Sequence, residues 1–246
     1  MPHLFVNRQR QYDLGVQAGQ SRRHFVWETV NAVLYKIGGV VFIIGSVLFF
    51  PRFEAYADLG AWTFFFGSLL YLVVTGHDAA EVWRNRRQTT ERDIHTQLET
   101  IAAGGYLFGT LLFTAGSIFF LSSVGLTTAG AWCFVLGSLL FLVAAAVNVL
   151  QIVQASSLLT LQLMNLTAVS FVAGSVLFTV ASIPYLWSIE SAIDEREIAA
   201  FLAWQYLAGS ALFLLGGVFN YWRACLVIHE HKLDEAAARA REQLAQ

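Results

Sequence analysis

Two nearly identical stretches decide the fold of this chain: GAWTFFFGSLLYLV at residues 60–73 and GAWCFVLGSLLFLV at residues 130–143. Both are apolar almost throughout, and neither alternates between apolar and polar residues as a half-buried strand does. An apolar run of this length, extended by its flanks, favours a helix that crosses a hydrocarbon core. The duplication also indicates that one structural unit occurs more than once in the chain.

The composition of the whole chain is typical of a membrane protein. Of the 246 residues, 57% are hydrophobic and 13% are charged, whereas a soluble domain has about 25% charged residues. Six apolar runs cover residues 33–50, 61–75, 101–121, 131–147, 166–186 and 199–219. Only helices and closed barrels satisfy their backbone hydrogen bonds in lipid, and unbroken apolar runs do not fit barrel strands. We therefore predict an all-α polytopic membrane protein with six spans.

Lys and Arg are distributed unevenly among the segments that flank these spans. All of them except Arg52 and Arg196 lie in or beside the N-terminal arm, the segment after the second span, or the C-terminal tail. The loops that contain these two arginines are acidic overall. The positive-inside rule therefore predicts that both termini lie in the cytoplasm.

Each predicted span contains one copy of a short motif, in which an aromatic residue precedes a small residue and a serine, and a second aromatic residue follows. The copies are FIIGSVLF (42–49), FFFGSLLY (64–71), FTAGSIFF (113–120), FVLGSLLF (134–141), FTVASIPY (178–185) and YLAGSALF (206–213). The small residues of the six copies are Gly45, Gly67, Gly116, Gly137, Ala181 and Gly209. We therefore predict three tandem helical hairpins, each made of two related helices.

The spacing within the motif places its small and aromatic residues on one face of each helix. Small residues let helix backbones approach closely in lipid, where apolar burial alone does not drive association, and rings from the neighbouring helix fill the remaining space. We interpret the motif as a packing surface, with a serine-lined ion path as the alternative. Each even span has a tryptophan near its outer end, away from the termini: Trp62, Trp132 and Trp204. These residues are predicted to anchor the bundle at the outer interface.

A polar position recurs on the packing face of the even spans. Asp78, Asn148 and Asn220 each follow the small residue of their motif by eleven positions, about 16 Å further toward the cytoplasmic boundary. Polar side chains that face a bundle interior either hold helices together or form a functional site. In the first case the three residues bond across helices; in the second they form a cytoplasm-facing polar site in which Asp78 is the only acid. Lys36 is predicted to extend toward the inner headgroups rather than to pair with Asp78.

Catalytic and cofactor-binding patterns are missing from the sequence. We find no nucleophile–base pairing, phosphate-binding loop, dinucleotide fingerprint or zinc-protease motif. The pair His77 and Glu81 and the cluster at residues 229–231 supply too few convergent ligands for zinc. We therefore expect a protein that is not an enzyme, binds no metal or cofactor, and does not bind nucleic acid.

These patterns divide the chain into six segments. They are an N-terminal cytoplasmic or interfacial arm (1–28), hairpin repeat 1 (29–83), a basic cytoplasmic linker helix (84–98), hairpin repeat 2 (99–154), hairpin repeat 3 (155–228) and a C-terminal cytoplasmic helical tail (229–246).

The GAWxFxxGSLLxLV segment, together with an upstream FxxGSxLF helix, resembles the YrhK-like family of small bacterial membrane domains. On this resemblance, the first two hairpins are the clearer copies and the third is a divergent copy with a longer loop. The resemblance implies a bacterial inner-membrane location. It implies no established activity and transfers no site residue.

Three functions stay open at this point. The first is a structural or interaction subunit that self-associates or joins a membrane complex through its Gly/Ser-aromatic helix faces. The second is a small transporter or channel, because tandem hairpins can surround a path. The third is a binder of membrane lipid or another hydrophobic ligand, which the abundance of phenylalanine would favour.

Overall fold

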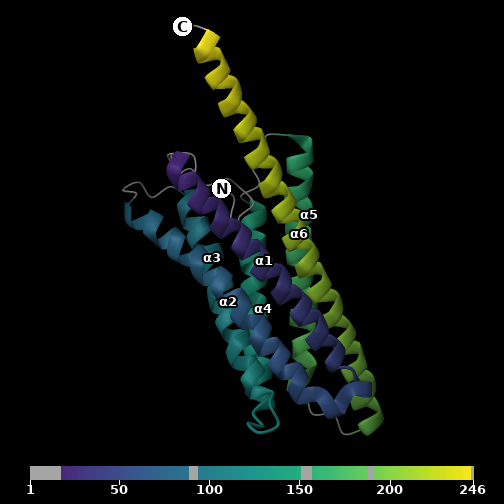
Figure 1. Ribbon diagram of the computed structural model, residues 1–246. Coiled ribbons are helices and arrows are strands. Elements are labelled where there is room, and N and C mark those ends of the chain that lie inside the picture. The colour runs from purple at the N-terminus through teal and green to yellow at the C-terminus, as the bar shows by residue number, and fades with distance from the viewer. Residues whose placement is uncertain (1–17, 89–93, 151–156, 188–190, 245–246) are drawn as a thin grey trace.

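The chain is a bundle of long helices (Figure 1). The computed structural model describes residues 18–88, 94–150, 157–187 and 191–244, and contains no strand among them. Its helices are α1 (Ala18–Leu48), η2 (Pro51–Tyr56), α2 (Ala57–Gln88), α3 (Ile94–Phe119), α4 (Thr127–Leu150), α5 (Leu158–Ser182), η3 (Ile183–Leu186) and α6 (Ala192–Leu244). Within the described ranges, six helical segments are long and apolar enough to cross a membrane. The predicted all-α, six-span architecture is thus confirmed.

Two predicted segments do not form separate elements. Residues 18–28, assigned above to the N-terminal arm, are the beginning of α1, and the rest of the arm lies outside the described residues. The expected linker helix at 84–98 is divided between the end of α2 and the beginning of α3, and residues 89–93 are not described. The described residues of both stretches thus continue the spanning helices α1, α2 and α3.

The six long helices form a closed ring. Each packs against its neighbours in the sequence, and α1 closes the ring against α6. The hairpins are α1–α2, α3–α4 and α5–α6, and their connections gather at one end of the bundle, which we name the loop end (Figure 1). The opposite end, where α1 begins and α6 ends, is the termini end.

Aromatic rings fill the inside of the ring of helices. The first aromatic residues of the six motifs are all at most 5% exposed: Phe42, Phe64, Phe113, Phe134, Phe178 and Tyr206. Some of these rings meet across the axis rather than only within a hairpin; the Phe113 and Phe178 centroids are 5.6 Å apart, and those of Phe42 and Phe178 are 6.5 Å apart. Because the rings touch at the centre, the bundle is a packed core and not an open tube.

Each ring of this core rests on a small residue of the partner helix. A Cβ atom placed on Gly45 would lie 2.6 Å from the ring of Phe64, and one on Gly116 would lie 2.7 Å from the ring of Phe134. The third hairpin repeats the contact, since a Cβ atom placed on Gly209 would lie 2.6 Å from the ring of Phe178. Contacts this short leave no space for a methyl group, so the glycines set the distance between paired helices.

Two glycines of α3 give a direct test of this role. Gly109→Ala is expected to lower the free energy of unfolding by about 1–3 kcal/mol, because its Cβ would lie 2.6 Å from Phe141 and 2.9 Å from the backbone oxygen of Gly137. Gly104 has no neighbouring atom within 4 Å of such a Cβ. Gly104→Ala should therefore be neutral or stabilise by up to about 1 kcal/mol, since alanine favours the helix. Unfolding by SDS titration in mixed micelles measures both, and equal effects would contradict the packing role.

Candidate polar site at the termini end

The three polar positions expected from the repeat all point into the bundle. Asp78, Asn148 and Asn220 are 3%, 2% and 1% exposed, respectively. They come from α2, α4 and α6, which are alternate helices of the ring. The repeat therefore places one polar side chain per hairpin inside the same end of the bundle.

A tyrosine of α3 links two of these residues. The Nδ2 atom of Asn148 donates a hydrogen bond to the hydroxyl oxygen of Tyr106, over 3.3 Å. Asp78 is close enough to this tyrosine to interact with it electrostatically. Tyr106 lies ten residues before Gly116, a position at which the other odd helices also have an aromatic residue, Tyr35 or Phe171. The sequence pattern therefore indicated only a packing role for its ring and not the hydrogen bond of its hydroxyl group.

The third position binds an arginine that sequence reasoning did not include. Arg223 is 2% exposed, and its Nη2 atom donates a hydrogen bond to Oδ1 of Asn220 over 2.7 Å. The two residues lie three positions apart on α6 and so share a helix face. This spacing was the sequence signal for the pair, because an arginine three residues after a buried asparagine lies on the same helix face.

Two further buried polar residues lie on odd helices toward the termini end. Glu99 of α3 is 2% exposed, and Asn31 of α1 is 5% exposed. The Nδ2 atom of Asn31 lies 3.2 Å from Nδ1 of His77, directly before Asp78, which fixes α1 and α2 at the same depth. His77 in turn lies 3.8 Å from a carboxylate oxygen of Glu81. His77 and Glu81 therefore lie side by side on α2, at the edge of the site.

We call this set of buried polar residues the polar layer. Its members are Asn31, Asp78, Glu99, Tyr106, Asn148, Asn220 and Arg223. Among the described residues it includes the three charged side chains that are almost fully buried, two carboxylates and one guanidinium.

Tryptophans on the outside of the bundle indicate the depth of the polar layer. Trp62 and Trp83 are 41% and 63% exposed and lie at opposite ends of α2, about 31 Å apart along a helix. This distance matches a hydrocarbon core of about 30 Å. Asp78 precedes Trp83 by five residues, so it lies about 7 Å inside the boundary at the termini end.

Aromatic residues close the polar layer on the side of the core. The rings of Tyr35 and Tyr71 stack with their centroids 4.5 Å apart, and Tyr35 also meets the ring of Phe171 across the bundle at 6.0 Å. The hydroxyl of Tyr35 donates a hydrogen bond to the backbone oxygen of Phe213. The polar layer is therefore separated from the loop end by packed rings.

The other residues singled out in the sequence lie outside this layer. Trp132 and Trp204, like Trp62, are exposed near the loop end. Lys36 is half-buried, and its Nζ atom lies 4.0 Å from the ring centroid of Tyr221, so it lies at the seam between α1 and α6. Within the described residues, no three His, Cys, Asp or Glu side chains are grouped so that they could hold a metal ion.

The small residues and serines of the motifs are buried in contacts within this chain. Gly67 and Gly137 contact Phe42 and Phe113 of their own hairpins, and Ala181 is fully buried. The motif serines are at most 1% exposed. These helix faces therefore hold the three hairpins together and are covered in the single chain.

Removing the guanidinium tests whether the polar layer is balanced electrostatically. Arg223→Met keeps much of the volume but removes the hydrogen bond to Asn220 and the one almost fully buried cation among the described residues, so it should lower the free energy of unfolding by about 3–5 kcal/mol. Arg84→Met, at an exposed position of α2, should change it by less than about 0.5 kcal/mol. SDS titration of both variants provides the measurement, and similar small effects would show that the charges are not coupled to folding.

Comparison with known proteins supports the repeat. Residues 26–81 and 96–153 match the model of the YrhK-like protein family, and the two segments coincide with the α1–α2 and α3–α4 hairpins. No curated protein and no solved structure matches the chain. The α5–α6 hairpin lies outside the matched segments although it has the same motif and packing. Two tandem segments of this chain therefore match the YrhK-like family, as the motif predicted.

Proposed function

We propose that this integral membrane protein is not an enzyme and that its polar layer binds a small cation from the termini end. The observation that carries the proposal is the burial of Asp78 and Glu99, from two different hairpins, with Arg223 as the fully buried counter-charge among the described residues. On the positive-inside prediction, the termini end faces the cytoplasm of the bacterial inner membrane.

A purely structural role does not account well for this arrangement. Replacing buried ion pairs by apolar residues of similar size is often neutral or stabilising. Ionisable residues inside a membrane bundle are accordingly rare, and they commonly belong to ion, proton or ligand sites. The first hypothesis, self-association through the glycine motif, is weakened because these faces are covered within the chain.

The chemistry of the polar layer favours a cation over an anion. Carboxylates outnumber the guanidinium among the fully buried charges, and asparagine adds amide oxygens that suit hard cations. The aromatic core, closed across the axis by contacts such as that of Phe113 with Phe178, favours a site that opens only to the termini end. We therefore propose binding at one face of the membrane rather than continuous conduction in this conformation.

Thermal unfolding in mild detergent tests the proposal. A cation that binds the folded protein raises its stability by mass action, by about 2.7 kcal/mol at a hundredfold excess over Kd. We expect sodium, potassium or ammonium chloride to raise the unfolding midpoint above its value in choline chloride of equal ionic strength. Asp78→Asn should remove this difference.

The repeat makes Asp78→Asn a well-matched variant, because the other two hairpins already have asparagine at the equivalent positions. Glu195→Gln, at an exposed position of α6 near the loop end, is the control and should keep the cation effect. The proposal fails if no cation exceeds choline, or if the folded Asp78→Asn protein retains the full effect.

The interaction role remains a second candidate because of the length of α6. This helix has 53 residues, whereas its apolar run covers only residues 199–219. The helix continues to Leu244, about 37 Å beyond this run. Figure 1 shows this end of α6 projecting beyond the other helices, where a partner or a second copy could bind it.

Truncation separates this candidate from the cation site. A chain that ends at Ile228 should keep the unfolding midpoint of the bundle but lose any partner or second copy that native mass spectrometry detects on the full chain. If the full chain is a monomer without a partner, or if truncation changes nothing, the tail has no assembly role.

A further inference from the structure

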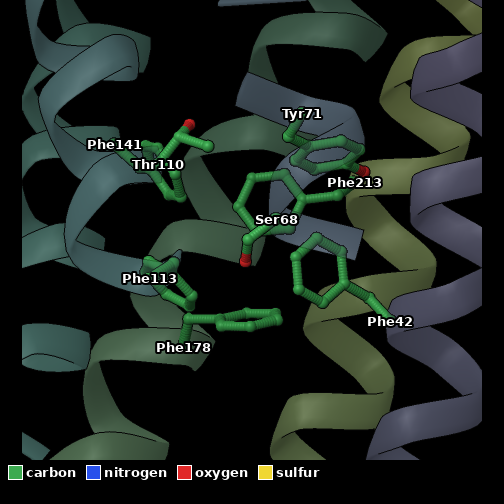
Figure 2. A pocket seen from close by; sticks show the side chains of 8 residues that line it. All are labelled: Phe42, Ser68, Tyr71, Thr110, Phe113, Phe141, Phe178 and Phe213. Atoms are coloured by element: carbon green, nitrogen blue, oxygen red, sulfur yellow. The ribbon is translucent and has the colours of Figure 1, made fainter. Parts of the chain in front are cut away.

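The aromatic core leaves no room for a ligand. A cavity of about 10 Å³ lies between its rings, among them those of Phe42, Phe113 and Phe178 (Figure 2). A cavity of this size is at the lower limit for a single water molecule. The outer surface of the helices, by contrast, is open to lipid along the whole bundle.

Arginines gather on this outer surface at the end of α2. Arg84, Arg86 and Arg87 are all exposed, and so is the tryptophan that precedes them, Trp83. Their spacing of three and four residues places them on one side of the helix. Val82, which is 3% exposed, belongs to the buried side, and no acidic residue occurs from Val82 to the end of α2. We call Trp83 and the three arginines the basic face.

The basic face lies at the depth of the lipid headgroups. Trp83 is about 31 Å from Trp62 along α2, so it marks the boundary of the hydrocarbon core at the termini end. Tryptophan favours this boundary because its ring is apolar and its N–H is polar. The arginines follow Trp83 by one to four residues, which places them up to about 6 Å beyond it. Their guanidinium groups are therefore level with phosphate groups rather than with acyl chains.

Trp83 also orders one of the arginines. The Cζ atom of Arg87 lies 5.1 Å from the centroid of the Trp83 ring, which is a cation–π contact. This contact restrains the side chain without neutralising its charge. Arg84 lies three residues before Arg87, on the same side of the helix. Guanidinium groups bind phosphate oxygens through paired N–H donors, so this pair is suited to one phosphate.

We propose that the basic face is a binding site for the headgroup of an anionic phospholipid such as phosphatidylglycerol. Arg84 and Arg87 hold the phosphate, and Trp83 packs against the glycerol backbone and the first acyl carbons. A zwitterionic lipid also has a phosphate, but its ammonium group is repelled by the surplus positive charge. The site does not depend on the cation site, because Asp78 of the same helix points into the bundle.

Native mass spectrometry of the full chain in mild detergent tests the site. We expect the first phosphatidylglycerol to bind at least about fivefold more tightly than phosphatidylcholine with the same acyl chains. The double variant Arg84→Gln/Arg87→Gln should weaken phosphatidylglycerol binding by about fivefold for each arginine removed, and should change phosphatidylcholine binding little. Arg52→Gln/Arg196→Gln is the control. It removes the same charge from exposed positions near the loop end and should keep the preference.

Three results would overturn the proposal. They are equal affinity of the unmodified protein for the two lipids, an equal loss in the control variant, and displacement of the lipid by equimolar glycerol phosphate. The last result would mean that the basic face binds a free phosphate ester and not a lipid. A second measurement uses bilayers that contain phosphatidylglycerol. Solid-state NMR should detect dipolar contacts between arginine side-chain nitrogen and lipid phosphorus that weaken in Arg84→Gln/Arg87→Gln, and unchanged contacts would also contradict the site.

Discussion

The close approach of paired helices, in which an aromatic ring of one helix lies on a small residue of the other, is the constraint on which the structure depends. Lipid provides no hydrophobic drive to bring helices together, so association rests on van der Waals contact and a few polar bonds. The ring of Phe134 on Gly116 and the ring of Phe178 on Gly209 fulfil this requirement in separate hairpins. The contact recurs in all three hairpins, and the hairpins close into a ring.

Closure of the ring determines where polar residues can lie. Rings occupy the axis over most of its length, and among the described residues the buried charged and amide side chains lie toward the termini end. There, Asp78, Glu99 and Arg223 are removed from lipid and from most solvent at once. Their burial is unfavourable unless the charges compensate one another.

The third hairpin keeps the packing of the first two although its sequence does not match the family model. The YrhK-like family model matches the first two hairpins only. The third has alanine for one glycine, a proline in its motif and a longer connection. Nevertheless, Gly209 receives the ring of Phe178 just as Gly137 receives that of Phe113. A small residue opposite a ring is sufficient for this geometry, and many sequences can provide it.

The sequence by itself determined the helical class, the six spans, the pairing of motif faces and the inward direction of Asp78, Asn148 and Asn220. These features follow from local rules, namely apolar length and helical periodicity, which need no knowledge of distant contacts. Only the tertiary structure decided that Glu99 and Arg223 belong with these residues and that Tyr106 joins Asn148. Each of these depends on which helices meet across the ring. The spacing of residues along one helix determines which side chains share a face of that helix. Which neighbouring helix covers that face depends on how the whole bundle closes.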